Sequence, residues 1–266
     1  TTMPGPPADV GALDATVEFW MRGLASENSA AAVVCGANNN WIYGNIIVDR
    51  DRYNTDRSYG ISIAGGRVVF GVDGNGTGSQ TICSASSVLN NQWRHVAVER
   101  RRSDGWMWLY IDGNLEAQAD GPDGDISYPD NGVPGFFCPA PGQSGTGTTQ
   151  CVNSDPYIVI GAEKHDAGSA FPSYSGWFDE MRISNSIRYS ANFVRPTAPF
   201  TADATTAALY HFNEGSGDVV IDISGASGGP SNAVRRFGGT PAGPAWVVSD
   251  VSYGGSPDIT PPTVSI

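Results

Sequence analysis

Two consecutive stretches decide the fold of this chain: residues 91–100 (NQWRHVAVER) and residues 106–114 (WMWLYIDGN). Both are rich in β-branched and aromatic residues and alternate in polarity, as half-buried strands do. Asp104-Gly105 separates them, and Asp-Gly pairs tolerate the positive φ angles of tight hairpin turns. The segment is therefore predicted to be a β-hairpin, and a second Asp-Gly at 112–113 predicts a further turn.

Short β-rich runs recur along the chain, separated by glycine turns such as Gly65-Gly66. The runs are residues 15–22, 31–35, 45–49, 58–63, 67–72, 81–84, 93–101, 106–112, 157–161, 176–184 and 207–213. Many short strands at this spacing predict an all-β protein, a two-sheet antiparallel sandwich or jelly roll. The one helical candidate, residues 185–193 before Pro196, is expected to cap the sandwich.

Composition narrows the range of partners. With 34 glycines, 18 prolines and 16% charged residues, the chain favours strands and turns over helical bundles. A formal net charge of -12 disfavours an electrostatically driven nucleic-acid partner. No apolar stretch approaches the ~20 residues that span a bilayer, so membrane insertion is not expected.

Four cysteines, Cys35, Cys83, Cys138 and Cys151, allow three pairings. None lies in a C-x-x-C motif or at finger spacing from a histidine, which disfavours zinc. We expect disulfides Cys35–Cys83 and Cys138–Cys151 and hence an extracellular location, secreted or at a cell surface. Free buried thiols are the alternative.

The domain organisation is predicted from segments that interrupt the succession of short strands. Residues 1–252 form one domain, in which residues 120–156 are an insertion rich in Gly, Pro, Thr and Asp. Unstructured loops this long are uncommon unless they are functional or inserted. Residues 253–266 are interpreted as a linker and the start of a following immunoglobulin-like (Ig-like) module, so the chain is expected to be part of a larger modular protein.

Four motifs carry a family resemblance. Trp93-Arg-His-Val-Ala-Val, Leu109-Tyr-Ile-Asp-Gly, residues 177–183 (WFDEMRI) and residues 210–217 (YHFNEGSG) with 222–225 (DISG) follow one another in this order. They resemble bacterial laminin-G-like (LamG) domains of the concanavalin A-like lectin/glucanase superfamily. The resemblance implies a concanavalin A-like jelly roll, with binding on the concave sheet or along its rim. The family includes lectins, carbohydrate-binding modules, adhesion domains and a few enzymes, so fold alone does not fix function.

The resemblance also implies a structural Ca²⁺ site at Asp179. Alternation places Asp179 on the face of Met181 and Ile183, where an unpaired carboxylate is costly. Oxygen ligands suit Ca²⁺. The candidate partners are Asp9, Asp14, Asp218 and Asp222. The alternative is an aspartate that accepts backbone N–H groups.

A second acidic group lies in the insertion, where Asp120, Asp123, Asp125 and Asp130 alternate with glycines. Asp123 and Asp125 are the alternative calcium ligands, although the bidentate Glu of an EF-hand is missing. Solvated turns are the simpler explanation. Residues 49–52 (DRDR) are interpreted as a mixed-charge turn with no ligand role.

An aromatic stripe is the candidate binding surface. If Leu109 and Ile111 face the core, Trp106, Trp108 and Tyr110 share the opposite face. Rigid flat rings stack on the C–H faces of sugars at low entropic cost, and three of them at this spacing span roughly 13 Å. In the alternative hypothesis, the insertion covers all three.

No motif in the sequence indicates a catalytic site. The E-x-D-x-(x)-E motif of the superfamily's glycosidases is absent, and so are a nucleophile elbow and a P-loop. We therefore predict a non-catalytic, calcium-stabilised carbohydrate-binding module whose partner is a glycan or polysaccharide. Two alternatives are a protein-binding adhesion module and a glycan-active hydrolase or lyase that uses His165 in the loop after residues 160–161.

Overall fold

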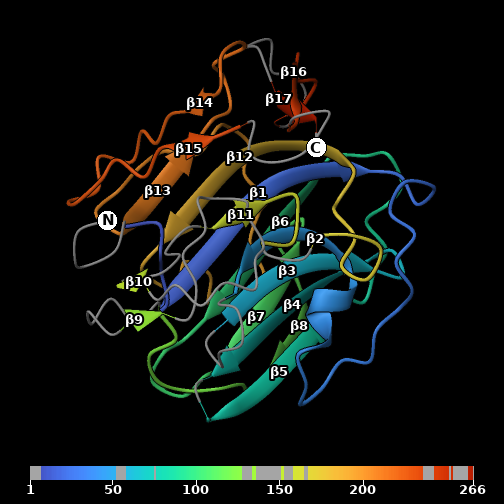
Figure 1. Cartoon of the computed structure of the whole chain (residues 1–266), viewed down its shortest axis with the longest axis vertical. Helices are drawn as coiled ribbons and strands as arrows, with labels where there is room; N and C mark the ends of the chain where they lie inside the picture. Colours follow the sequence, from blue (N-terminus) through green and yellow to red (C-terminus); the bar gives the residue numbers. More distant parts are fainter. Residues whose placement is uncertain are drawn as a thin grey trace.

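The fold is described from a computed structural model, which covers residues 7–51, 58–74, 76–127, 134–135, 151–152, 158–164, 167–235, 243–251, 253 and 263–265. This part of the chain forms two antiparallel sheets packed face to face, with two additional two-stranded ribbons (Figure 1). The predicted all-β, concanavalin A-like sandwich is confirmed. In the described residues the single helical element is the turn η1 (Asn40–Tyr43), and no helix there is long and apolar enough to cross a membrane.

The large sheet has the strand order β16-β17-β12-β1-β6-β7-β8, and β13 also pairs with β12. Its strands are β1 (Ala15–Gly23), β6 (Arg94–Arg100), β7 (Met107–Ile111), β8 (Asn114–Ala119), β12 (Gly176–Ser184), β13 (Thr206–Tyr210), β16 (Ala245–Val247) and β17 (Thr263–Ser265). Strand β8 was not predicted, because its sequence NLEAQA lacks β-branched residues. Strand β17 pairs with β12 within this sheet, and the Ig-like module predicted to begin there stays a prediction.

The small sheet has the order β11-β2-β3-β4-β5. Its strands are β2 (Asn45–Arg50), β3 (Ser58–Ala64), β4 (Arg67–Gly74), β5 (Gly78–Cys83) and β11 (Val159–Ile160). The ribbons are β9 (Pro134–Gly135) with β10 (Cys151–Val152), and β14 (Val219–Val220) with β15 (Ala233–Val234).

The core lies between the two sheets, and the predicted hairpin supplies part of it. Val96 pairs with Ile111 and Val98 with Leu109, and all four side chains are buried in the main cluster. Burial of this apolar face fixes the register, because a slip of one residue would turn every side chain to the other face.

A β-bulge in β12 changes which way Asp179 points. Phe19 pairs with Met181, but the next residue, Trp20, pairs with Asp179, so Glu180 is an extra residue and has φ +46. Because directly paired residues share a face, Asp179 lies on the outer face with Trp20. The prediction that it shares the face of Met181 and Ile183 is wrong.

The predicted strand at residues 31–35 is also wrong, because this segment belongs to a loop over the outer face of the small sheet. Trp41 of η1 is buried against Gly60 and Gly71, where a side chain would occupy the place of the indole. The predicted disulfide Cys35–Cys83 is present, with Cα atoms 6.0 Å apart, and ties the loop to β5. The partner predicted for Cys151 is Cys138, which lies outside the described residues.

Residues 185–205 connect β12 to β13, and we call them the strap. They lie against the outer face of the large sheet, where they contact Glu99, Tyr110 and Gly113. They contain no helix, contrary to the prediction for residues 185–193. The backbone N–H groups of Arg188 and Tyr189 both donate to Glu99 Oε1, at 2.8 and 3.0 Å. Glu99 thus accepts from the Tyr189 N–H, which a helix beginning at residue 185 would direct to the Asn185 carbonyl.

Candidate functional site

Trp106 and Trp108 lie at the β6–β7 hairpin on the outer face of the large sheet. Met107 and Leu109 point into the core, which turns the two indoles away from it. Both tryptophans are half-buried, with ring centroids 6.4 Å apart and planes at 55°. Both indoles therefore keep part of their surface accessible, although the Arg101 guanidinium lies over one face of Trp108.

Polar groups surround the two indoles. The Arg101 guanidinium lies 5.2 Å from the Trp108 ring centroid. It also donates to both carboxylate oxygens of Asp104, at 2.8 and 2.6 Å, which holds the turn in place. On β8 the exposed Gln118 is paired with Trp108. Hydrogen-bonding groups of both kinds, donors and acceptors, thus border the rings.

Tyr110 does not extend this surface, so its predicted role as an exposed third ring is wrong. Its side chain is 1% exposed, and its hydroxyl donates to the Tyr189 carbonyl at 3.2 Å. The rings of Tyr189 and Phe193 lie 6.0 and 5.4 Å from it. The cover over Tyr110 is the strap, a segment that the sequence interpretation treated as a cap on the sandwich.

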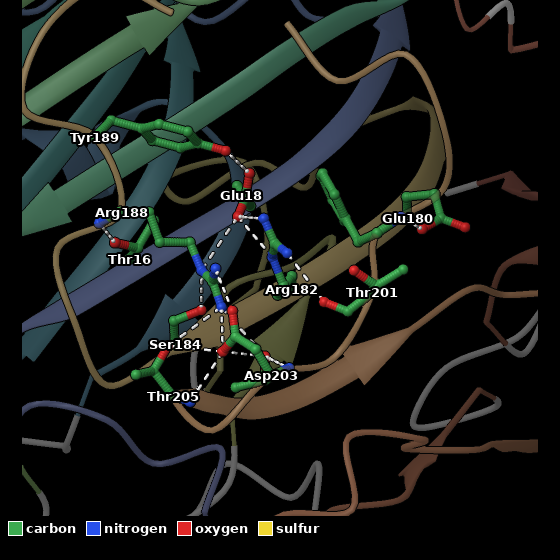
Figure 2. A network of polar contacts seen from close by, with 12 residues as sticks. Thr16, Glu18, Glu180, Arg182, Ser184, Arg188, Tyr189, Thr201, Asp203 and Thr205 are labelled. Carbon is green, nitrogen blue, oxygen red and sulfur yellow. Dashed lines mark hydrogen bonds and ion pairs between the residues drawn. The ribbon is translucent and has the colours of Figure 1, made fainter.

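A buried polar network holds the strap on the sheet (Figure 2). The Glu18 carboxylate accepts from the Tyr189 hydroxyl at 2.6 Å and from Arg182 Nε at 2.8 Å, and it contacts His95 Nε2 at 3.2 Å. Burial alone raises the pKa of Glu18, but the hydrogen bond and charge of His95, the Arg182 charge and the Tyr189 hydroxyl outweigh it. The net pKa lies below its ordinary value, so Glu18 is an anion that anchors the strap.

Arg188 and Glu99 complete the anchor. Arg188 forms a bidentate pair with Asp203, at 2.9 and 3.0 Å, which closes the strap on itself (Figure 2). Glu99 Oε1 also accepts from the Thr16 hydroxyl at 2.9 Å. Burial raises the pKa of Glu99 to about 7, because the hydrogen bonds that it accepts only partly offset the loss of solvation. Its other oxygen, Oε2, is buried without a hydrogen-bond partner among the described residues.

A cluster of three carboxylates could hold a cation. Ligand oxygens of Asp49, Asp51 and Glu163 lie within 4.8 Å of one another. Burial, together with the charges of Asp51 and Glu163, raises the pKa of Asp49 well above its ordinary range. Lys164 borders the cluster, with its backbone N–H on Asp49 Oδ2 at 2.9 Å and its ammonium on the Asp51 carbonyl at 3.1 Å. The interpretation of residues 49–52 as a turn missed this cluster, because Glu163 is remote in sequence.

The aspartates predicted as calcium ligands are not brought together. Asp179 accepts from Ser249 Oγ at 2.6 Å and from the Glu180 backbone N–H at 2.9 Å, and Asp222 accepts from the backbone of Leu209, Ser224 and Ser231. Asp9 pairs with Arg50, Asp14 accepts from the backbone of Arg102, and Asp218 pairs with Arg235. Within the described ranges none of them joins a group of three metal-ligating side chains. These aspartates bind backbone groups, arginines and a serine hydroxyl instead.

The loop alternative is no closer to a metal site. Asp123 and Asp125 are exposed, and Asp125 accepts from the backbone and hydroxyl of Ser127 at 2.9 and 2.7 Å. Asp130 and His165 lie outside the described residues. The described start of the insertion closes one end of the sandwich, where Ile126 is buried in the main core.

Comparison with known families agrees with this architecture. Residues 3–134 match the laminin G type 3 profile (Laminin_G_3), which is described as the concanavalin A-like lectin/glucanases superfamily. This part of the chain belongs to the laminin-G-like domains of this superfamily. The predicted family is confirmed. No match was found among curated protein sequences.

Several solved structures are similar to this laminin-G-like chain at low sequence identity. A candidate carbohydrate-binding protein from Bacteroides ovatus is 15% identical, with a TM-score of 0.52 over 86% of this chain and 54% of its own. Domains LG4-5 of the mouse laminin alpha1 chain are 18% identical, with a TM-score of 0.41 over 66% of this chain and 36% of their own. The CBM40 domain of a Ruminococcus gnavus IT-sialidase is 14% identical, with a TM-score of 0.39 over 68% and 80%. The chain spans about half the length of the Bacteroides structure, and the similarity concerns the fold.

Proposed function

We propose that this laminin-G-like chain is an extracellular, non-catalytic carbohydrate-binding module and that it binds glycan at Trp106 and Trp108. The observation that carries the proposal is the pair of half-buried indoles, 6.4 Å apart, on the outer face of the large sheet. Its superfamily includes lectins by description, and a structure of the same fold from Bacteroides ovatus is described as a candidate carbohydrate-binding protein, which supports this assignment.

Binding would combine stacking with a few directed hydrogen bonds. The C–H face of a pyranose would lie on each indole, and Gln118, Arg101 and Asp104 would pair with the hydroxyls at the ring edges. Trp108 is held between β6 and β8, and the Arg101–Asp104 pair fixes the turn. Since Trp108 and the Arg101–Asp104 pair are held in this way, little of their conformational entropy would be lost on binding.

We also propose that Ca²⁺ stabilises the domain at Asp49, Asp51 and Glu163. The donor set fits: Ca²⁺ prefers carboxylate oxygens, and a divalent cation would offset both the loss of solvation on burial and the repulsion from Asp51 and Glu163 that together raise the pKa of Asp49. The bound ion would link β2 to the residues that follow β11. The Cys35–Cys83 disulfide supports an oxidising, extracellular location for the protein.

The glycan proposal is tested by retention on a panel of neutral and acidic polysaccharides in affinity electrophoresis. Trp106→Ala and Trp108→Ala should each weaken retention at least tenfold, or about 1.4 kcal/mol, with an unchanged melting temperature. Trp177→Ala is the matched control, because Trp177 is also half-buried but lies on β12, beside Arg22. If the hairpin variants keep full retention, or if they lose several kcal/mol of stability, the indoles are not the binding surface.

The calcium proposal is tested by thermal melting in Ca²⁺ and in chelator. Calcium at a hundred times its dissociation constant should add about 2.7 kcal/mol of stability, and Glu163→Gln should abolish that gain. Asp218→Asn, which removes a half-exposed carboxylate elsewhere, should preserve it. Identical melting curves with and without Ca²⁺ would show that Lys164 and hydrogen bonds suffice to hold the cluster.

A further inference from the structure

Beyond the tryptophan pair, we infer that the glycan site continues from Trp108 onto the strap, where Phe193 and Tyr189 provide the next aromatic surface. The ligand is then an internal stretch of a neutral glycan chain, several sugars long, in preference to a single terminal sugar. This inference rests on the proposed function, because it extends the same site.

The first step is continuity between the hairpin and the strap. Tyr110 follows Trp108 by two residues on the same face of β7, about 7 Å further along the strand. Tyr110 is itself buried, but the ring of Phe193 lies 5.4 Å from it and the ring of Tyr189 lies 6.0 Å from it. Trp106 and Trp108 form one pair of neighbouring rings, and Tyr110 with the two strap rings that cover it is the next aromatic group along the same face.

The second step is accessibility. Phe193 and Tyr189 are half-buried, and their rings are stacked nearly parallel, with centroids 3.5 Å apart and planes at 7°. The strap thus covers Tyr110 but presents aromatic surface of its own in its place. The stripe that the sequence predicts along one strand is completed by a segment about 80 residues further along the chain.

The third step is rigidity. The Phe193 backbone N–H donates to the Gly113 carbonyl at 2.8 Å, and the Leu115 N–H donates to Asn192 Oδ1 at 2.8 Å. The Tyr189 hydroxyl is fixed on Glu18 (Figure 2). Both ends of the 189–193 stretch are therefore tied to the sheet, so that a ligand would meet an ordered surface.

The fourth step is the charge of this surface. Residues 189–194 (YSANFV) carry no charged side chain, and Ser190, Asn192 and Val194 are exposed among them. Hydroxyl and amide groups beside aromatic rings suit uncharged sugars, and a net charge of -12 disfavours polyanionic glycans. Trp106 and Trp108 lie about 7 Å apart along the strand, and the strap rings over Tyr110 lengthen the site to roughly 13 Å, the length of two or three sugars.

The test is a chain-length series. Calorimetric titration would use cello-, laminari-, manno- and xylo-oligosaccharides of two and of six residues. The wild type should bind a hexasaccharide at least tenfold more tightly than the matching disaccharide. Phe193→Ala and Phe193→Leu should each remove most of that gain and leave disaccharide affinity unchanged, whereas Val194→Ala should behave as wild type. The leucine variant retains apolar bulk over Tyr110, so it separates the loss of a ring face from a loss of folding.

The outcomes distinguish the inference from the proposed function. If Trp108→Ala abolishes all binding but Phe193→Leu leaves the hexasaccharide affinity intact, the strap is no part of the site and only the inference fails. Equal loss for both lengths in the Phe193 variants would likewise overturn it, since that result indicates a structural role. A wild type that binds no member of any series would overturn the proposed function and the inference together.

Discussion

Replacing Glu99 by glutamine should make the domain less sensitive to pH. Glu99 is fully buried beneath the strap, where Oε1 accepts from Thr16, Arg188 and Tyr189 while Oε2 has no hydrogen-bond partner among the described residues. Burial raises its pKa from 4.5 to about 7. Glutamine keeps the accepting oxygen and is neutral at every pH, so it imitates the protonated acid.

The sign and the size of the effect follow from linkage. Between pH 4.5 and about 7 the folded protein holds a proton on Glu99 that the unfolded chain has released, so the free energy of unfolding falls as pH rises through this window. A tenfold change in proton affinity is worth about 1.4 kcal/mol, so the contribution lost by pH 8 is about 3 kcal/mol. Glu99→Gln should match wild type near pH 4.5 and exceed its stability by about 3 kcal/mol at pH 8.

The measurement is urea unfolding of both proteins at half-unit steps from pH 4.5 to pH 8, followed by tryptophan fluorescence. Only the difference between the two proteins matters, because other carboxylates contribute equally to both curves. Glu27→Gln, at an exposed position, controls for the loss of one negative charge. A difference that stays constant across the pH range, or one that favours wild type at pH 8, would refute the argument from burial.

Three further predictions concern stability and can be checked by chemical denaturation. Trp41→Ala should cost about 3–5 kcal/mol, because the indole is buried on Gly60 and Gly71; a loss below 1 kcal/mol would mean that the loop is not packed as described. The double variant Cys35→Ala/Cys83→Ala opens a loop of 48 residues and should cost about 4 kcal/mol by chain entropy. Asp222→Ala leaves three backbone N–H groups without an acceptor and should lower the free energy of unfolding by about 3 kcal/mol. Asp218→Ala, at a half-exposed position, should lower it little.

The fold could be predicted from local patterns because its strands are short, alternating and separated by Gly-rich turns. Residues 91–114 alone define two strands, their turn and the face that enters the core. The register of Val98 with Leu109 follows from burial of that face, which a sequence displays directly. Segments that depend on distant partners were harder to predict.

Three features of the candidate site illustrate that limit. The sheet face on which Asp179 lies depends on the bulge at Glu180, which has φ +46 although it is not a glycine. The alternation of polar and apolar residues in the sequence does not reveal this bulge. The strap contains the predicted helix, but backbone N–H groups of this segment donate to Glu99, about 90 residues earlier. The Asp49 and Glu163 carboxylates meet only because β11 pairs with β2.

The central position of β1 has a consequence for the order in which the domain folds. Strand β1 lies between β6 and β12, and β12 begins at Gly176, more than 150 residues after β1 ends at Gly23. During synthesis, the edge of β1 that pairs with β12 stays unpaired until most of the chain has been made. Sheets closed by such distant pairings fold slowly, in milliseconds to seconds. Variants that weaken the β1–β12 pairing should therefore lower the yield of folded protein more than their equilibrium stability implies, since the nascent chain exposes an apolar strand edge meanwhile.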